Sequence, residues 1–524
     1  MMQARQPTVL RQLQWSEKSR MQHLNKGAWL TLATVLLLPL ASMAIVPLYD
    51  TSEPRYAEIA RIMAQTGDWI TPWFSPGVPF WGKPPLSFWA QALSMKTFGL
   101  NEFAARFPSW LCLLLSNGIL LAGLRSLLGP RIAFLSAIVY STCTLVYISS
   151  GAVLTDPFLA LGTTLSLVSF AVVIHMRGQA LMEIGDERNE LADTRGKFSY
   201  QWWQYGFFVG LAVGLLAKGP LAVVVSIAPV AVWYVLNRKV ISTSTVLPWS
   251  KGLALMAVLC VPWYVLAEIK TPGFLNYFIV GEHFRRFLDP GWSGDLYGSA
   301  HRRVYGTIWL YWIQASFPWG VLMLGLIIGA LRSVRLRSVL KATAGYPFFS
   351  YWLASALFTP LLFTFSANIL WTYLLPSLAG FSILVAIMTD QIEKQFGDKK
   401  IGVFTRIVWV ACIVPVVILG LSITVWAKPD LRNTERGLVR YVTQQGEPAI
   451  PLRYFSTLPF SAQFYSAGQA RELNGNDLRR MLELDTTFYL AVPKGEQKIV
   501  ADILGKPFNQ LYANKRYILI RVPF

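Results

Sequence analysis

Ionisable residues are concentrated in residues 49–58, directly after the first apolar block of the sequence. Asp50 and Glu53 supply two carboxylates there, and Arg55 and Tyr56 follow at once. A carboxylate can orient or deprotonate an acceptor hydroxyl. Glu53 also precedes a proline that can begin a helix, so capping and surface solvation give a purely structural interpretation. The density of the cluster favours a function, because ionisable groups at a membrane interface are costly. Asp50 is the first candidate for a catalytic acid and Glu53 the second.

A third carboxylate, Asp156, stands in the sequence Leu154-Thr155-Asp156-Pro157. An Asp before a Pro at the first helical position is typical of a helix N-cap. Capping does not exclude a role in catalysis, so both interpretations of Asp156 stay open.

Cations occur in three turns whose residue types suit a phosphate. Lys83 lies in a Gly-Lys-Pro-Pro turn, Lys218 in a Lys-Gly-Pro turn, and Arg286 follows Arg285. Open helix N-termini add N–H donors to such turns, and arginine binds phosphate through two N–H groups. The structural alternatives are lysines that extend to the membrane surface and a basic interfacial helix on anionic lipid head groups.

Two further residues complete the candidate site. Tyr373 can donate a hydrogen bond to a lipid head group or belong to an interfacial aromatic belt. His283 is a candidate metal ligand, but no further Cys or His spacing defines a metal site. A divalent metal therefore stays open as a cofactor, and no other cofactor is predicted.

These residues must be positioned by membrane spans. Hydrophobic residues make up 54% of the 524 residues and charged residues only 14%, which predicts a polytopic α-helical membrane protein. Segments 84–99 and 276–290 raise the number of spans from about eleven to thirteen if each hides a short span. The eleven expected spans are residues 28–48, 104–124, 132–149, 153–175, 203–217, 219–236, 252–269, 306–331, 347–365, 369–389 and 403–427.

The distribution of basic residues predicts the orientation. The net charge is +19, and the basic residues lie mostly in short loops between the apolar blocks, which argues against a nucleic-acid-binding protein. In a topology with eleven spans these loops all fall on one side of the membrane. The positive-inside rule makes that side cytoplasmic. The tail 1–27 is then cytoplasmic. The loop 49–103, with interfacial helices, the loop 270–305 and residues 428–524 lie on the opposite side, together with every candidate residue.

Residues 428–524 have a different character from the apolar blocks. Residues 453–455, 487–492 and 517–522 predict strands, and residues 496–504 predict a helix. We therefore expect a small α/β domain on the side of the candidate site.

Seven motifs along residues 28–390 resemble those of polyprenol-phosphate-sugar-dependent glycosyltransferases of the GT-C class, in particular the aminoarabinose transferases of lipid A and the protein O-mannosyltransferases. The motifs are residues 50–58, Gly67-Asp68-Trp69, Gly82-Lys83-Pro84-Pro85, residues 101–106, Ala217-Lys218-Gly219-Pro220, Glu282-His283-Phe284 and Tyr373-Leu374-Leu375-Pro376.

The resemblance implies a glycosyltransferase domain over residues 28–427 and a periplasmic C-terminal domain. It implies an inverting transfer of sugar from an undecaprenyl-phosphate-linked donor at the periplasmic face of a bacterial inner membrane. The acceptor would be a lipid or glycan such as lipid A or lipopolysaccharide. Catalysis is implied for the acids of the first loop and phosphate binding for Lys83 and Arg286. Arg55, Tyr56, Lys218 and Asp156 are implied as neighbours in the active site.

The sequence departs from the family pattern at three positions. Ser52 stands before Glu53 where adjacent acids are frequent, Gly82 replaces an acid, and Asn368 stands where a lysine is common. The alternative function is a transporter or flippase of an anionic lipid or solute. That function needs ionisable residues near the middle of the membrane and internal symmetry, whereas the charges here lie at span ends and no repeat is evident.

Overall fold

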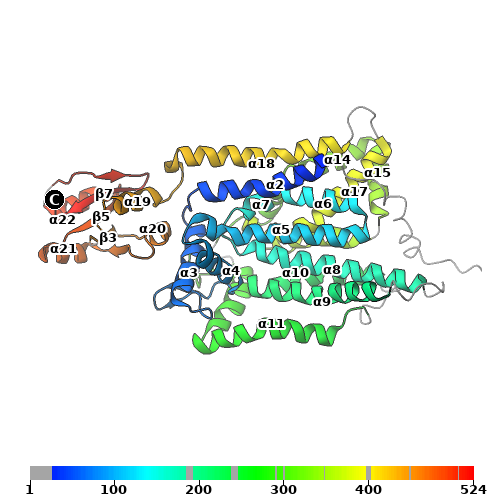
Figure 1. The fold of residues 1–524 in the computed structure, drawn as a ribbon, viewed down its shortest axis with the longest axis horizontal. Helices are drawn as coiled ribbons and strands as arrows, with labels where there is room; N and C mark the ends of the chain where they lie inside the picture. Colours follow the sequence, from blue (N-terminus) through cyan, green and yellow to red (C-terminus); the bar gives the residue numbers. More distant parts are fainter. Residues whose placement is uncertain are drawn as a thin grey trace, which may run out of the picture.

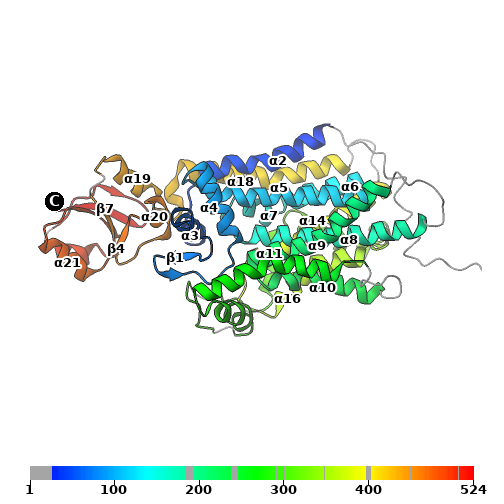
Figure 2. The same cartoon turned by 60° about the horizontal axis from the view of Figure 1, so that its bottom comes forward.

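The computed structural model describes residues 26–183, 193–237, 246–289, 292–298, 301–346, 348–366, 368–396, 403–447, 450–505 and 507–523. The protein is a long helical bundle with a small α/β domain beyond one end (Figure 1). The segments α3 and α4 lie between the bundle and this domain (Figure 2). We call this end of the bundle the domain end.

The bundle contains a helix or helix pair for each of the eleven expected spans. Its helices are α2 (Lys26–Ile45), α5 (Glu102–Leu127), α6 (Pro130–Thr142), α7 (Thr144–Ser150), α8 (Asp156–Glu183), α9 (Asp193–Lys218), α10 (Leu221–Asn237), α11 (Trp249–Lys270), α13 (Thr307–Ser316), α14 (Trp319–Arg332), α15 (Val334–Ala344), α16 (Phe349–Thr364), η4 (Trp371–Ser377), α17 (Leu378–Phe396) and α18 (Val403–Ala427).

Not all of these helices are long and apolar enough to be regular membrane spans. In the described ranges, six helices are long and apolar enough to cross a membrane, or up to nine if each bent pair is one span. The α6–α7 pair bends by 70° and the α13–α14 pair by 107°. Helix α10 has only 17 residues, and α9 begins with polar residues. The protein is therefore polytopic and helical as expected, with fewer regular spans than hydropathy alone suggested.

The centre of the bundle is held by close helix contacts. A Cβ atom on Gly162 of α8 would lie 2.6 Å from the carbonyl oxygen of Gly210 on α9. Small residues allow two membrane helices to approach to backbone contact. This contact fixes the two helices whose ends at the domain end carry Asp156 and Lys218.

The first loop forms α3 (Ser52–Thr66), the hairpin of β1 (Trp73–Ser75) and β2 (Val78–Pro79), and α4 (Leu86–Phe98). Helix α3 ends at Gly67, which has a φ of 71°. The alternative interpretation of the first-loop acids, surface solvation, is wrong for Glu53 and Glu58, which are only 7% and 3% exposed. Helix α3 lies between α4 and α20 (Phe460–Tyr465) of the C-terminal domain.

The two segments that were candidates for a twelfth and a thirteenth span, residues 84–99 and 276–290, form helices too short to cross a membrane. Helix α4 has 13 residues. Residues 276–288 form the π-helix η3 (Asn276–Arg285) followed by α12 (Arg286–Leu288). Both are shorter than the roughly 20 residues that a spanning helix needs. They form instead the walls of the domain end.

The C-terminal domain is a mixed five-stranded sheet flanked by helices. The predicted strands and helix correspond to β3, β5, β7 and α22, whereas the sequence pattern missed β4, β6 and three helices. The sheet order is β4-β3-β5-β7-β6, with β3 parallel to β4 and β5 and with β7 antiparallel to β5 and β6. The elements are η5 (Pro429–Leu431), α19 (Arg436–Gln444), β3 (Leu452–Phe455), α20 (Phe460–Tyr465), β4 (Arg471–Leu473), α21 (Gly475–Glu483), β5 (Phe488–Pro493), α22 (Gln497–Leu504), β6 (Tyr512–Ala513) and β7 (Tyr517–Val522).

Candidate active site

A cavity of about 610 Å³ opens at the domain end. Its wall comes from the first loop, the end of α7, the start of α8, the end of α9, residues 282, 286, 295, 297, 298 and 301, residues 370–373, and Phe460 of the C-terminal domain. It is lined by the nine residues selected as catalytic or phosphate-binding candidates: Asp50, Glu53, Arg55, Tyr56, Lys83, Asp156, Lys218, Arg286 and Tyr373. The metal-ligand candidate His283 is not among its lining residues. The structure also brings in residues that the sequence reasoning did not select, among them Glu282, Asp295, Tyr297 and Phe460.

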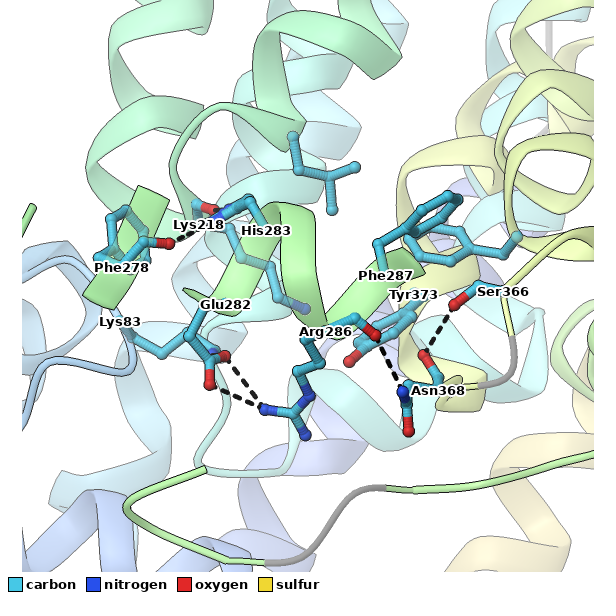
Figure 3. Close-up of a pocket in the computed structure, with 12 residues that line it drawn as sticks. Lys83, Lys218, Phe278, Glu282, His283, Arg286, Phe287, Ser366, Asn368 and Tyr373 are labelled. Atoms are coloured by element: carbon cyan, nitrogen blue, oxygen red, sulfur yellow. Dashed lines mark hydrogen bonds and ion pairs between the residues drawn. The ribbon is translucent and has the colours of Figure 1, made fainter. Parts of the chain in front are cut away.

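Lys83 and Arg286 are joined by Glu282 (Figure 3). The Nζ of Lys83 lies 3.3 Å from Glu282 Oε2, and Nη1 of Arg286 lies 3.0 Å from Glu282 Oε1. Burial opposes the negative charge of Glu282, but the two cations outweigh it and lower its pKa below the ordinary 4.5. Glu282 stands four residues before Arg286 on a helix, and this spacing is the signal that could have identified it.

The guanidinium of Arg286 is only partly used by contacts with the protein. Its Nη1 also lies 3.3 Å from Asp295, whereas its buried Nε has no partner within the described residues. Asn368, at the position where the family pattern has a lysine, donates to the carbonyl oxygens of Arg286 and Asp289 at 2.9 and 3.2 Å. Asn368 therefore holds the backbone that carries Arg286.

Lys218 and Asp156 form an ion pair between the end of α9 and the start of α8. Both side chains are 8% exposed. The Nζ of Lys218 also lies 4.7 Å from the centre of the Tyr373 ring, a cation–π contact. Asp156 does begin a helix as expected, and its carboxylate faces a cation of the cavity wall.

Glu53 is a buried anchor of the first loop. Its carboxylate accepts from Arg106 Nη2 at 2.8 Å and from the backbone N–H of Val153 at 3.0 Å. Arg106 is 2% exposed and also donates to backbone carbonyls at the end of α2 and just beyond it. Both oxygens of Glu53 thus have donors from the protein itself.

Asp50 is held by the C-terminal domain. Its Oδ1 accepts the N–H of Ser461 at 2.9 Å, and its Oδ2 accepts the Ser461 hydroxyl at 2.6 Å and Arg516 Nη2 at 2.5 Å. No motif in the sequence indicated Ser461 or Arg516, because both lie more than 400 residues beyond Asp50 in the chain.

Arg55 and Tyr56 shape the side of the cavity nearest the segment 292–298. Nη1 of Arg55 donates to the carbonyl oxygen of Tyr297 at 2.6 Å, and its guanidinium lies over the ring of Tyr56. The Tyr297 hydroxyl donates to the carbonyl of Pro79 at 2.7 Å. These contacts tie the segment 292–298 to the first loop.

Each ring nitrogen of His283 lies within hydrogen-bond distance of a backbone carbonyl oxygen. Nδ1 lies 2.8 Å from the oxygen of Phe278, and Nε2 lies 3.0 Å from that of Lys218. Within the ranges that the structure describes, no group of three or more His, Cys, Asp or Glu side chains is arranged to hold a metal ion. In this arrangement His283 links η3 to the turn that carries Lys218.

The architecture belongs to a known class of membrane protein. A model of the dolichyl-phosphate-mannose-protein mannosyltransferase family matches residues 30–278. The crystal structure of ArnT from Cupriavidus metallidurans bound to undecaprenyl phosphate has the same fold, with a TM-score of 0.72 over 95% of this chain and 98% of that chain at 17% identity. Its apo state gives a TM-score of 0.69.

The sequence is also similar to curated relatives over most of its length. It is 31% identical over 71% of its residues to the undecaprenyl phosphate-alpha-4-amino-4-deoxy-L-arabinose arabinosyl transferase of Edwardsiella ictaluri, and 27% identical over 74% to that of Aeromonas hydrophila. The chain spans 61% and 64% of these two relatives. The resemblance inferred from the motifs is thus confirmed, and the chain is a multi-pass membrane protein with the ArnT fold.

Proposed function

We propose that the protein is a glycosyltransferase of a bacterial inner membrane that uses a sugar linked to undecaprenyl phosphate. The observation that carries the proposal is a cavity lined both by Lys83, Lys218 and Arg286 and by the carboxylates of the first loop. The similarity to arabinosyl transferases supports the same donor class. The cavity faces the periplasm if the basic loops are cytoplasmic.

The reaction is an inverting displacement. Asp50 takes the proton of an acceptor hydroxyl, whose oxygen forms a bond to the anomeric carbon of the sugar. The bond from that carbon to the phosphate oxygen breaks, and undecaprenyl phosphate leaves with the bonding electrons. Lys83, Arg286 and Lys218 stabilise the charge that develops on the phosphate. The acceptor we propose is lipid A or lipopolysaccharide.

The two acids of the first loop have different roles in this proposal. Both acids line the cavity, and each accepts three hydrogen bonds from the protein. Arg106, the main partner of Glu53, also donates to backbone carbonyls around the end of α2, so Glu53 fixes the loop. Asp50, the first candidate from the sequence, is assigned as the catalytic base. The transporter alternative is not favoured, since the similar proteins are transferases and the cavity lies at one end of the bundle.

The test is transfer by the purified protein from an undecaprenyl-phosphate-linked sugar to lipid A, followed by mass spectrometry. Wild type is expected to add one sugar mass to the acceptor, and Asp50→Asn and Lys83→Met are expected to lose at least about 100-fold in rate. Full activity of Asp50→Asn would refute its catalytic role. Net donor transport across vesicles without any product would refute the transferase function itself. Mass spectrometry of lipids and glycans from cells with and without the gene identifies the acceptor.

A further inference from the structure

The C-terminal domain contacts the first loop at Asp50. Three donors of this domain reach the Asp50 carboxylate, whose side chain is only 4% exposed. An ionised carboxylate has about four acceptor sites. Three are occupied, two of them on Oδ2, and the free site is on Oδ1. The rotation of the Asp50 carboxylate is therefore set entirely by a domain that begins almost 380 residues later in the chain.

Arg516 is itself fixed by a second buried carboxylate. Glu435, whose side chain is 0% exposed, accepts from Arg516 Nη2 at 2.8 Å and Nε at 3.2 Å. Asn514 Nδ2 donates to Glu435 at 2.8 Å. Burial opposes the positive charge of Arg516, but Glu435 and Asp50 outweigh it and raise its pKa. The guanidinium therefore stays charged and oriented.

The same domain also fixes the backbone before Asp50. The N–H of Asp50 donates to the carbonyl of Asn433 at 2.9 Å. The N–H of Leu48 donates to the Tyr465 hydroxyl at 2.7 Å, and the Thr434 hydroxyl donates to the carbonyl of Leu48 at 2.8 Å. Backbone and side chain of Asp50 are thus positioned by one rigid neighbour.

The domain takes part in the cavity as well. Phe460, the first residue of α20, lines it together with Asp50 and lies 5.6 Å from Phe74 of the first loop between ring centres. Ser461 is the next residue of α20 and contacts Asp50 directly. The wall of the cavity and the orientation of its acid therefore come from the same short helix.

We propose that Ser461 and Arg516 are positioning residues for Asp50, so that the catalytic centre is completed by the C-terminal domain. This inference rests on the proposed function. Ser461 and the Nη2 of Arg516 hold the carboxylate with its free Oδ1 site toward the acceptor hydroxyl. Neither residue is among those that line the cavity, so their effect is expected on the turnover step.

The inference is tested by measuring kcat and the KM for the donor with the full chain, as wild type and as the variants Ser461→Ala, Arg516→Lys and Arg516→Gln. We expect kcat to fall about 10- to 100-fold in Ser461→Ala and Arg516→Gln with an unchanged KM for the donor, because misplacement of a reacting group costs rate rather than donor binding. Arg516→Lys restores part of kcat because it keeps the charge. Arg521→Gln is the matched control, because Arg521 lies on β7, is 45% exposed and pairs with Glu447.

The split between kcat and KM separates positioning from general stability, because a loss of folded protein lowers the amount of active enzyme and does not change its turnover. Ser461→Ala keeps every charge and tests the inference if Arg516→Gln does not fold.

The outcomes distinguish the two proposals. An active wild type whose Ser461→Ala and Arg516→Lys variants keep the wild-type kcat would overturn the positioning role alone. A rise in donor KM without a fall in kcat would overturn it as well. An inactive wild type that binds the lipid-linked donor would overturn the proposed function, and this inference with it.

Discussion

At the scale of single residues, the carboxylates of the cavity are distinguished by their partners. Asp156 pairs with Lys218, Glu53 with Arg106, and Asp50 with Arg516. A buried pair costs desolvation, and removal of one partner leaves the other charge uncompensated. Replacement of the carboxylate by its amide is therefore expected to affect stability and turnover differently at each of these three acids.

The Asp156–Lys218 pair is expected to couple strongly. Asp156→Asn leaves the buried ammonium of Lys218 without its carboxylate and should destabilise the protein by about 3–5 kcal/mol. The double variant Asp156→Asn/Lys218→Gln should recover part of this loss, which thermal unfolding in detergent measures as a double-mutant cycle. Additive effects of the two substitutions would contradict the coupling.

Glu53 is expected to act on stability rather than on turnover. Glu53→Gln weakens the contact with Arg106, a residue that is 2% exposed, and should lower the midpoint of thermal unfolding by several degrees. Asp50→Asn should abolish transfer while its unfolding midpoint falls less. Glu483→Gln on the exposed end of α21 is the control for a carboxylate lost without burial.

At the scale of elements, the π-helix η3 and the following α12 carry Glu282 and Arg286. Glu282 near the end of η3 holds both Lys83 and Arg286. The sequence predicted that these cations reach one face, because hydropathy and loop charge are local properties. It did not predict Glu282, since the contact with Lys83 joins residues that are 199 positions apart.

The lowered pKa of Glu282 predicts a pH dependence of stability. The folded-state pKa lies below the ordinary 4.5, with Lys83 and Arg286 as the cause that outweighs burial. The contribution is therefore present above about pH 4.5 and is lost as the pH falls through the folded-state value. The unfolding midpoint of Glu282→Gln should decline less than that of wild type below pH 5, whereas exposed Glu472→Gln should follow wild type. Equal slopes for all three would contradict this role.

At the scale of the whole molecule, the C-terminal domain is part of the cavity and not an appendage. It contacts α3 through α20 and lies beyond the domain end in both views (Figures 1 and 2). The basic segment 332–341, most of which belongs to α15, lies at the opposite end of the bundle. From the positive-inside rule we propose that the cavity and the domain lie on the periplasmic side.

Thiol labelling tests this orientation. Leu484→Cys in the C-terminal domain and Val334→Cys at the start of α15 replace side chains that are 64% and 76% exposed. A membrane-impermeant maleimide should label Leu484→Cys in intact spheroplasts and Val334→Cys only after permeabilisation. Wild type supplies the background, because Cys112, Cys143 and Cys260 are buried and Cys412 is half-buried. The reverse pattern would invert the topology.

The sequence by itself determined the helical membrane class, the single face on which the candidate residues gather, and most of the C-terminal strands. These properties follow from hydropathy, charge and side-chain alternation, which each stretch of chain carries locally. The nine residues selected as catalytic or phosphate-binding candidates line one cavity for this reason. Only the tertiary structure decided which partner each ionisable group has. Ser461 and Arg516 reach Asp50 across 411 and 466 residues, a pairing that depends on how two domains dock and that no local pattern encodes.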